Sequence, residues 1–360
     1  MADPIQVVSA QFRDWMAKAV EMEASDLHIV AGYPPVLRVH GDLRQIQTDP
    51  IDRDAVPGLL VPLCPPHAMA SFQAQRNVDF ALEITLHDRV QRLRANYFMN
   101  GQQMGACFRL IPSAIPDFQW AGFPEGLAKQ LTHFRNGLVL VGGVVGSGKT
   151  TTLAMLIHLL NQEGGYRIIT VEEPVEYLFP KTTGSVVTQR EVGPDVHTFA
   201  DGLKYALRQD TDVILVGEIR DRETAQMALS AAETGHLVFS TLHTRDAKGA
   251  ISRYADLFPQ SDQGEVRAQL ALGLRAVVIQ HLLPNVRPGE KRVLAMELLL
   301  NNSAIAASLR AGKIEAIDNI LLTSRSDGML TLDESIKRLL KEGSISMETA
   351  QRFVSPGTRL

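Results

Sequence analysis

Short apolar runs without polar alternation recur in the second half of the chain. Residues 138–141 read LVLV and residues 213–216 read VILV, and a third run over 168–171 ends in acidic residues. Strands of this kind are typical of a parallel sheet buried on both faces, and helical spacing of apolar residues after the first run supplies a covering helix. The pattern predicts an α/β fold for residues 123–300.

The first third of the chain has a different pattern. Helical spacing over residues 5–23 is followed by two strand-like segments around the Pro34-Pro35 turn, a second helix over 66–75 and three alternating segments within 77–111. This order predicts an α+β domain over residues 1–111. Prolines break up residues 112–122, which we interpret as a linker.

The C-terminal part, residues 301–360, is predicted to be a small helical subdomain. Thr331 and Glu334 have the spacing of a capping box, an apolar face follows, and Gly343 fits a C-terminal stop. We expect the surface of this tail to offer a docking face, although composition does not name the partner.

Composition narrows the function classes. The chain has 360 residues, a formal net charge of −4 and no block of like charges, so neither a nucleic-acid arm nor a basic membrane patch is indicated. Cys64 and Cys107 make no metal-ligand pattern. No signal core or long apolar stretch is present, so we expect a soluble, cytoplasmic protein without membrane insertion.

A glycine-rich loop follows the strand at 138–141 and precedes a helical pattern. Strand, glycine loop and helix in this order predict a phosphate-binding loop for ATP, in which backbone N–H groups surround the phosphates. Lys149 is expected to reach the β- and γ-phosphates and Thr150 to bind Mg²⁺. The residues predicted to bind nucleotide are Gly143, Gly146, Ser147, Gly148, Lys149, Thr150 and Thr151.

Acids follow two of the predicted strands, at the sheet edge where open α/β sheets bind ligands. Glu218 comes just after the strand at 213–216 and is the candidate acid for the metal. Glu172, Glu173 and Glu176 cluster around Pro174, and the residues alone do not choose which of the three positions water. His243, beyond another strand, is either a phosphate-sensing imidazole or a satisfied structural group.

Five ordered motifs resemble the secretion ATPases that drive type II secretion and type IV pili. The N-terminal segment "SDLHIVAGYPPVLRVHGDL" is similar to the shorter, pilus-retraction branch, the PilT/PilU type. The five motifs are "GGVVGSGKTTT", "ITVEEPVEY", "VVTQREVG", "ALRQDTDVILVGEIRD" and "AETGHLVFSTLHT". The resemblance implies a homo-hexameric ring whose subunits have a PAS-like N-terminal domain and a RecA-like P-loop ATPase domain that bind ATP between them.

The same resemblance assigns roles to single residues. Glu176 matches the acid thought to activate water, and Glu218 matches the Mg²⁺-associated acid. His236 and His243 match the family's His box. Three arginines fall near family arginines that reach the phosphates, although exposed strand arginines are an equal alternative: Arg92, Arg94 and Arg109.

The chain also departs from the family pattern. Glu173 stands where the family commonly has aspartate, and Val144-Val145 replace the usual Pro-Thr-like pair. The segment after residue 303 only partly resembles the retraction branch. The expected function is a motor ATPase for pilus retraction and twitching motility, docked on an inner-membrane pilus platform protein. The alternatives are an accessory subunit beside a second retraction ATPase, an assembly or type II secretion ATPase, and a nucleic-acid translocase.

Overall fold

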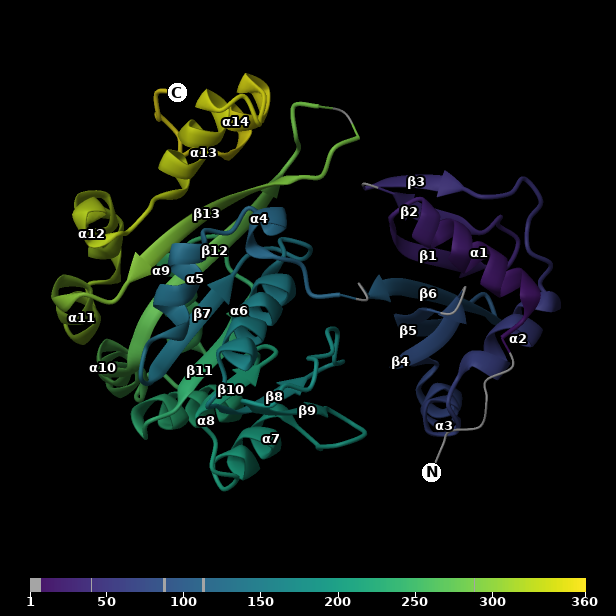
Figure 1. The fold of residues 1–360 in the computed structure, drawn as a ribbon, viewed down its shortest axis with the longest axis horizontal. Coiled ribbons are helices and arrows are strands. Elements are labelled where there is room, and N and C mark those ends of the chain that lie inside the picture. The colour runs from purple at the N-terminus through teal and green to yellow at the C-terminus, as the bar shows by residue number, and fades with distance from the viewer. Residues whose placement is uncertain (1–7, 40, 87–88, 112–113, 288) are drawn as a thin grey trace. The chain divides into compact units, whose positions relative to one another are not determined.

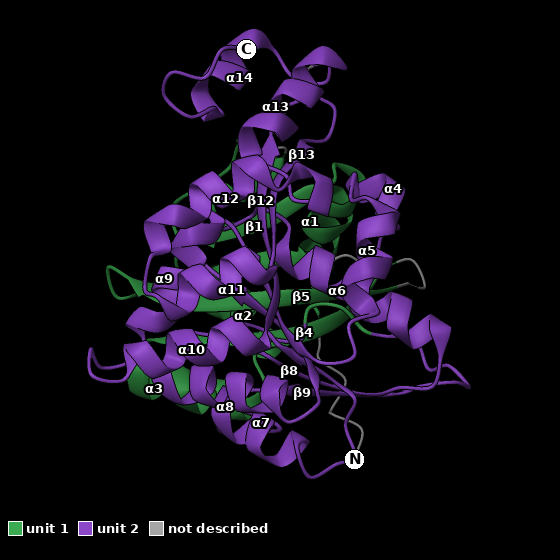
Figure 2. Cartoon of the chain, turned by 90° about the vertical axis from the view of Figure 1, so that its left-hand side faces the viewer, with its two compact units in different colours: residues 1–114, 176–178 green, residues 115–175, 179–360 purple. Residues whose placement is uncertain are grey.

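The structure is a computed structural model that describes residues 8–39, 41–86, 89–111, 114–287 and 289–360. The chain divides into two compact units (Figure 2). Unit 1 comprises residues 1–114 with 176–178, and unit 2 comprises residues 115–175 with 179–360.

Unit 1 is an antiparallel sheet with helices packed on it (Figure 1). Its sheet has the order β3-β2-β1-β6-β5-β4. The strands are β1 (Ala24–Val30), β2 (Val36–Val39), β3 (Asp42–Gln45), β4 (Asn77–Leu86), β5 (Arg89–Asn100) and β6 (Gln103–Ile111). The helices are α1 (Ala10–Glu21), α2 (Ala55–Leu60) and α3 (Pro66–Gln75). The predicted helix over 66–75 and the three strands within 77–111 are confirmed; residues 5–7 of the first predicted helix lie outside the described residues.

Buried and more exposed side chains alternate along β5 and so distinguish the two faces of this sheet. Leu93 and Tyr97 are fully buried, and the Tyr97 ring meets Phe108 of β6 edge-on at 5.9 Å. Phe12 of α1 packs on Phe108 from the helix side at 4.9 Å. Ala95, which lies between Leu93 and Tyr97 on the same face, is also fully buried, so the alternate positions Arg92, Arg94 and Asn96 point away from this core.

Unit 2 contains a seven-stranded sheet in the order β13-β12-β7-β11-β10-β8-β9. β7, β10 and β11 are buried at every position, as expected for parallel strands covered on both faces. The strands are β7 (Gly137–Gly142), β8 (Arg167–Glu172), β9 (Val186–Glu191), β10 (Val213–Val216), β11 (Leu237–Leu242), β12 (Leu274–Leu283) and β13 (Val293–Leu300).

The helices of unit 2 pack around this sheet and continue into the C-terminal tail (Figure 1). They are α4 (Phe118–Ala121), α5 (Glu125–Thr132), α6 (Lys149–Glu163), α7 (Phe199–Ala206), α8 (Arg222–Glu233), α9 (Ala247–Asp256), α10 (Gln263–Gly273), α11 (Ser303–Arg310), α12 (Ile317–Thr323), α13 (Leu332–Lys341) and α14 (Met347–Phe353). The predicted fold class is confirmed: an α+β N-terminal part precedes an α/β part with a helical tail.

The predicted linker over 112–122 contains α4. Asp117 accepts a hydrogen bond from Trp120 N and caps this short helix, and Phe118 packs beside Phe123 with 6.1 Å between ring centroids. Pro112 and Ser113 lie outside the described residues. The boundary between the units falls at Ala114–Ile115, and the tail over 301–360 is part of unit 2.

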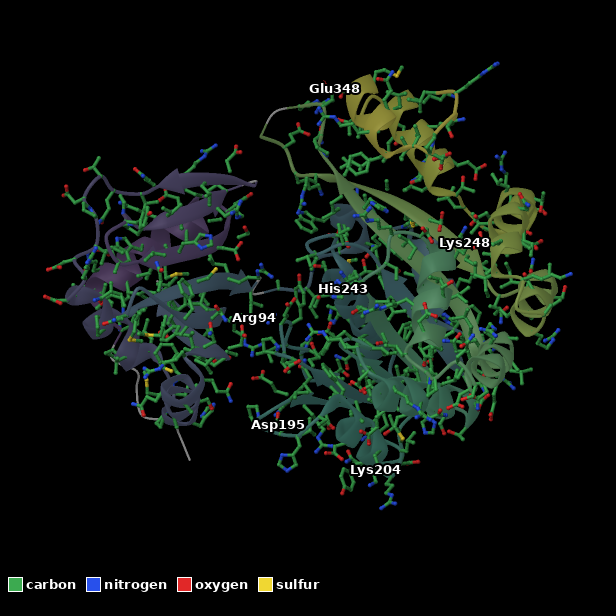
Figure 3. The ribbon with its side chains drawn as sticks, turned by 180° about the vertical axis from the view of Figure 1, so that it is seen from behind. Arg94, Asp195, Lys204, His243, Lys248 and Glu348 are labelled. Atoms are coloured by element: carbon green, nitrogen blue, oxygen red, sulfur yellow. The ribbon has the colours of Figure 1, made fainter. Side chains whose placement is uncertain are left out.

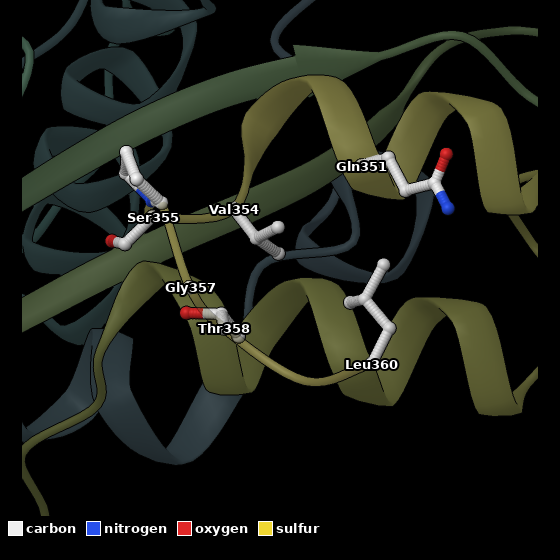
Figure 4. Close-up of a pocket in the computed structure, with 7 residues that line it drawn as sticks. Gln351, Val354, Ser355, Gly357, Thr358 and Leu360 are labelled. Atoms are coloured by element: carbon white, nitrogen blue, oxygen red, sulfur yellow. The ribbon is translucent and has the colours of Figure 1, made fainter.

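The tail carries the predicted capping box. Thr331 Oγ1 accepts from Glu334 N, and the Glu334 side chain accepts from Thr331 N, which satisfies two free donors at the start of α13. Downstream, Ser355 N and Thr358 Oγ1 donate to Asp333. The turn formed there lines a pocket that contains none of the predicted site residues (Figure 4).

Among the residues that the structure describes, no helix is both long and apolar enough to cross a membrane.

Candidate functional site

The glycine loop lies between the end of β7 at Gly142 and the start of α6 at Lys149. Gly143, Gly146 and Gly148 have φ values of +147°, +75° and +92°, which favour glycine. A Cβ on Gly143 would lie 2.3 Å from Ser147 Oγ and 2.6 Å from the Gln280 carbonyl oxygen, so that position admits no side chain. The loop is therefore shaped by backbone conformation and close packing.

Lys149 turns back onto this loop. Its Nζ donates to the carbonyl oxygens of Gly143 and Val144, both at 3.0 Å, and the residue is only 8% exposed. Ser147 Oγ is buried and finds no hydrogen-bond partner among the described residues. A buried hydroxyl without a partner is unfavourable unless a ligand satisfies it, which suits a loop that surrounds phosphate oxygens. Thr150 and Thr151, the other two predicted ligands, lie in the first turn of α6.

Residues of β12 and of the segment just before β13 contact α6 and the loop. Gln280 Nε2 of β12 donates to Thr152 Oγ1 at 2.7 Å in a buried contact. Arg292, just before β13, donates through Nη2 to the Gly146 carbonyl oxygen at 3.3 Å. Sequence reasoning missed both residues, because they lie about 130 positions or more beyond the loop and match no local motif.

Glu218 follows β10 at the same edge of the sheet as the glycine loop. β11 lies between β7 and β10 and pairs in parallel with both. Thr241 Oγ1 donates to the Gly217 carbonyl oxygen at 2.7 Å, and Ile219 N donates to the Thr241 carbonyl oxygen at 3.2 Å. The end of β11 thus holds the backbone on both sides of Glu218.

The Glu218 carboxylate lies close to two nitrogen-bearing side chains, Arg220 and His243. Arg220 Nε lies 2.5 Å from Glu218 Oε2, and His243 Nε2 lies 3.5 Å from the same oxygen. The Arg220 contact is an ion pair without hydrogen-bond geometry. The Glu218 side chain is only 13% exposed, so water screens its interactions with these groups only weakly. Sequence reasoning did not single out Arg220, although it lies in the quoted motif "GEIRD".

His243 lies just beyond the carboxyl end of β11 (Figure 3). Burial and the nearby Lys149 ammonium lower the pKa of His243, while Glu218 opposes that shift. The imidazole is therefore neutral at pH 7. Its electrostatic link to both Lys149 and Glu218 brings three predicted site residues together in unit 2.

The acids after β8 differ in environment. Glu172 is buried, and its Oε1 accepts from Thr170 Oγ1 at 2.6 Å and from Gln189 Nε2 at 3.3 Å. Glu173 is half-exposed and lies 4.0 Å from Arg220 Nη1. Glu176 belongs to unit 1 together with the three predicted arginines. Its role in activating water stays a prediction.

Those arginines share one face of the unit 1 sheet. Arg94 of β5 lies directly opposite Arg109 of β6, and Arg92 lies two positions along β5 on the same face. Each has an acidic partner: Arg92 Nε lies 3.1 Å from Glu83, Arg94 Nε 3.5 Å from Asp79, and Arg109 Nε 3.0 Å from Asp26. The structure brings the three together, and their contact with phosphate remains a prediction.

His236 lies at the opposite end of β11 from His243. Its Nδ1 is 3.1 Å from the carbonyl oxygen of Ala231 in α8. A strand of six residues separates the two histidines, so His236 does not join Lys149, Glu218 and His243.

The whole chain resembles known proteins. A family model described as type II/IV secretion system protein matches residues 3–352. The chain is 39% identical over 336 residues to the type IV pilus retraction ATPase PilT of Pseudomonas aeruginosa, covering 93% of this chain and 96% of PilT. It is 34% identical over 340 residues to the type IV pilus ATPase PilU of the same organism, and the match covers 94% of this chain and 87% of PilU.

A solved structure has the same architecture. The crystal structure of the pilus retraction motor PilT with bound ADP has a TM-score of 0.84 and 39% identity, and the match covers 96% of each chain. The agreement therefore covers residues of both units of the chain. The chain belongs to the type II/IV secretion ATPase family and is of its PilT/PilU type.

Proposed function

We propose that this chain is a P-loop ATPase that drives type IV pilus retraction as a ring of six copies. One observation carries the proposal: Lys149, Glu218 and His243 converge at one sheet edge in a chain that matches PilT and PilU over nearly its whole length. A glycine loop alone would support nucleotide binding, whereas an acid and a neutral imidazole beside its lysine also support hydrolysis.

The residues present fit a nucleotide and Mg²⁺. Gly143, Gly146 and Gly148 leave three positions of the loop without a side chain, and the buried Ser147 hydroxyl is available to an anion. The Thr150 hydroxyl and the Glu218 carboxylate are oxygen ligands of the type that Mg²⁺ prefers, with Glu218 acting directly or through water. When bound, Mg²⁺ neutralises charge on the phosphate oxygens.

The chain's own residues position the reaction. Lys149 places an ammonium against the β- and γ-phosphates, and the N-terminus of α6 adds backbone donors. Glu176 accepts a proton from the attacking water, and neutral His243 holds the Glu218 carboxylate in place. We assign to Arg92, Arg94 and Arg109 the stabilisation of charge that develops on the phosphates.

Binding and hydrolysis shift the ATPase domain against an N-terminal domain in the ring. A rigid-body change of this kind needs contacts that differ between ATP and ADP. His243 is our candidate for such a contact, since its ring interacts electrostatically with Lys149 and lies 3.5 Å from Glu218. The ring works in the cytoplasm at the inner membrane, where it docks on a pilus platform protein and acts alone or beside a second retraction ATPase.

An accessory role is the second candidate function. The likeness to PilU spans nearly the whole chain, and the glycine loop exposes Val144 and Val145, at 48% and 73%, in place of the family's usual pair. Weak turnover by a folded protein that binds ATP would favour this role.

The test is ATP turnover by purified protein over a range of protein concentrations. Specific activity that rises as rings assemble supports the proposal. Lys149→Ala is expected to abolish turnover, while Lys129→Ala, which removes an exposed lysine paired with Glu125, is the control. Wild-type turnover by the Lys149→Ala variant would overturn the phosphate site.

A further inference from the structure

Trp120 is an exposed indole on a fixed backbone. It lies in α4, where Asp117 Oδ1 accepts from Trp120 N at 2.6 Å and Lys291 Nζ donates to the Trp120 carbonyl oxygen. The residue is nevertheless 56% exposed. A large aromatic ring held out toward solvent on an anchored main chain loses little entropy when it binds a flat ligand.

Lys291 also covers part of the ring. Its Nζ lies 4.6 Å from the centroid of the indole, within the range of a cation–π contact. One ammonium covers one face of a ring, and the exposure of Trp120 leaves indole surface open to a second partner. The Lys291 ammonium keeps the indole in place and puts a positive charge next to it.

The next residue connects this ring to the glycine loop. Arg292 donates to the carbonyl oxygen of Gly146 at 3.3 Å, whereas Lys291 contacts Trp120. Consecutive Cα atoms lie about 3.8 Å apart, so one short piece of backbone carries both the side chain that contacts Trp120 and the side chain that contacts the phosphate loop. A nucleotide site combines a flat apolar surface for the base with an anion-binding loop for the phosphates, and residues 291–292 contact a candidate for each.

We propose that Trp120 is the base-stacking residue of the nucleotide site, with the purine of ATP on the open face of the indole and Lys291 holding the ring. This inference rests on the phosphate site proposed above. Stacking on one aromatic face reads the π-surface of a base rather than its edge, so GTP binds through the same contact.

The experiment compares ATP with inorganic tripolyphosphate, which carries the phosphates without the base. Binding of each is measured by calorimetry for the unmodified chain, Trp120→Ala and Trp120→Phe. Loss of one base–aromatic contact raises the Kd for ATP about tenfold or more in Trp120→Ala. The Kd for tripolyphosphate stays unchanged, and Trp120→Phe stays close to the unmodified chain.

A second readout needs no variant. The chain has two tryptophans, and Trp15 is only 3% exposed, so acrylamide quenches mainly the fluorescence of Trp120. ATP is expected to protect that fluorescence, and tripolyphosphate is not.

Three outcomes would overturn the inference. An unchanged Kd for ATP in Trp120→Ala would remove the stacking contact. An equal loss for both ligands would make Trp120 a structural support of the loop. Failure of the unmodified, folded chain to bind either ligand would overturn the phosphate site itself, which separates that failure from failure of the base contact alone.

Discussion

Arg220 Nε lies 2.5 Å from Glu218 Oε2, so a side-chain cation occupies the carboxylate that we assign to Mg²⁺. The guanidinium and the metal therefore compete for one oxygen. The Arg220 side chain is 64% exposed, and an exposed ion pair is worth about 0.2–1 kcal/mol, which limits how strongly it can hold Glu218.

We predict that Arg220→Gln lowers the Mg²⁺ concentration needed for half-maximal turnover, by at most about fivefold for a pair of that strength. A Mg²⁺ titration of ATP turnover measures this. Arg222→Gln is the matched control, because Arg222 is also exposed but pairs with Asp262. A higher Mg²⁺ requirement in Arg220→Gln would show that the arginine assists the metal instead of competing with it.

The pH dependence of turnover reports on His243. Its pKa lies below the ordinary value of 6.5, so the ring stays neutral as the pH falls from 7 to 6.5 and gains a proton only below that. Protonation places a second full positive charge against Glu218 and withdraws that acid from the metal. We expect turnover to be flat from pH 7 to 6.5 and to fall at lower pH.

His243→Gln removes the titrating ring but keeps a neutral polar side chain. Its pH profile is expected to lose the acid limb that His243 causes, at a reduced maximal rate. A profile with an unchanged acid limb would assign that limb to another group, such as a carboxylate.

The acids after β8 can be separated by substitution. Glu176→Gln should lower kcat by about 10²–10⁴-fold, the usual contribution of general acid–base catalysis, and leave the Kd for ATP unchanged. Glu173→Gln is the control, because Glu173 is half-exposed and only distantly paired with Arg220. Single-turnover hydrolysis together with equilibrium ATP binding distinguishes the two. A larger loss for Glu173→Gln would exchange their roles.

Two glycines of the loop make a matched pair for stability and binding. An added Cβ at Gly143 collides with Ser147 and the Gln280 carbonyl, whereas at Gly146 it meets no heavy atom within 4 Å. Gly146→Ala should therefore lower the free energy of unfolding by only about 1–2 kcal/mol, the strain of its left-handed backbone. Gly143→Ala should in addition abolish ATP binding, which calorimetry would measure. Retained binding would show that the loop tolerates rearrangement.

Parts of the site and of the fold around it could be predicted from local sequence. The glycine spacing, the buried strand before Glu218 and the Thr331–Glu334 capping box are patterns of adjacent residues, and the structure contains the corresponding elements. Gln280 and Arg292 could not be found in this way, since their contacts with the loop depend on how β12 pairs with β7. The ion pair of Arg220 with Glu218 could not be predicted either, because local sequence does not determine the direction of the Arg220 side chain.

The position of β11 fixes the width of the catalytic site. Since neighbouring strands lie about 4.8 Å apart, the single strand between β7 and β10 separates the phosphate loop from the acid strand by roughly twice that spacing. A metal held between the Glu218 carboxylate and a phosphate would bridge this gap. The hydrogen bonds of β11 to both neighbouring strands thus set the distance that the substrate must bridge. They keep that distance constant while the side chains at the carboxyl ends of the strands exchange partners.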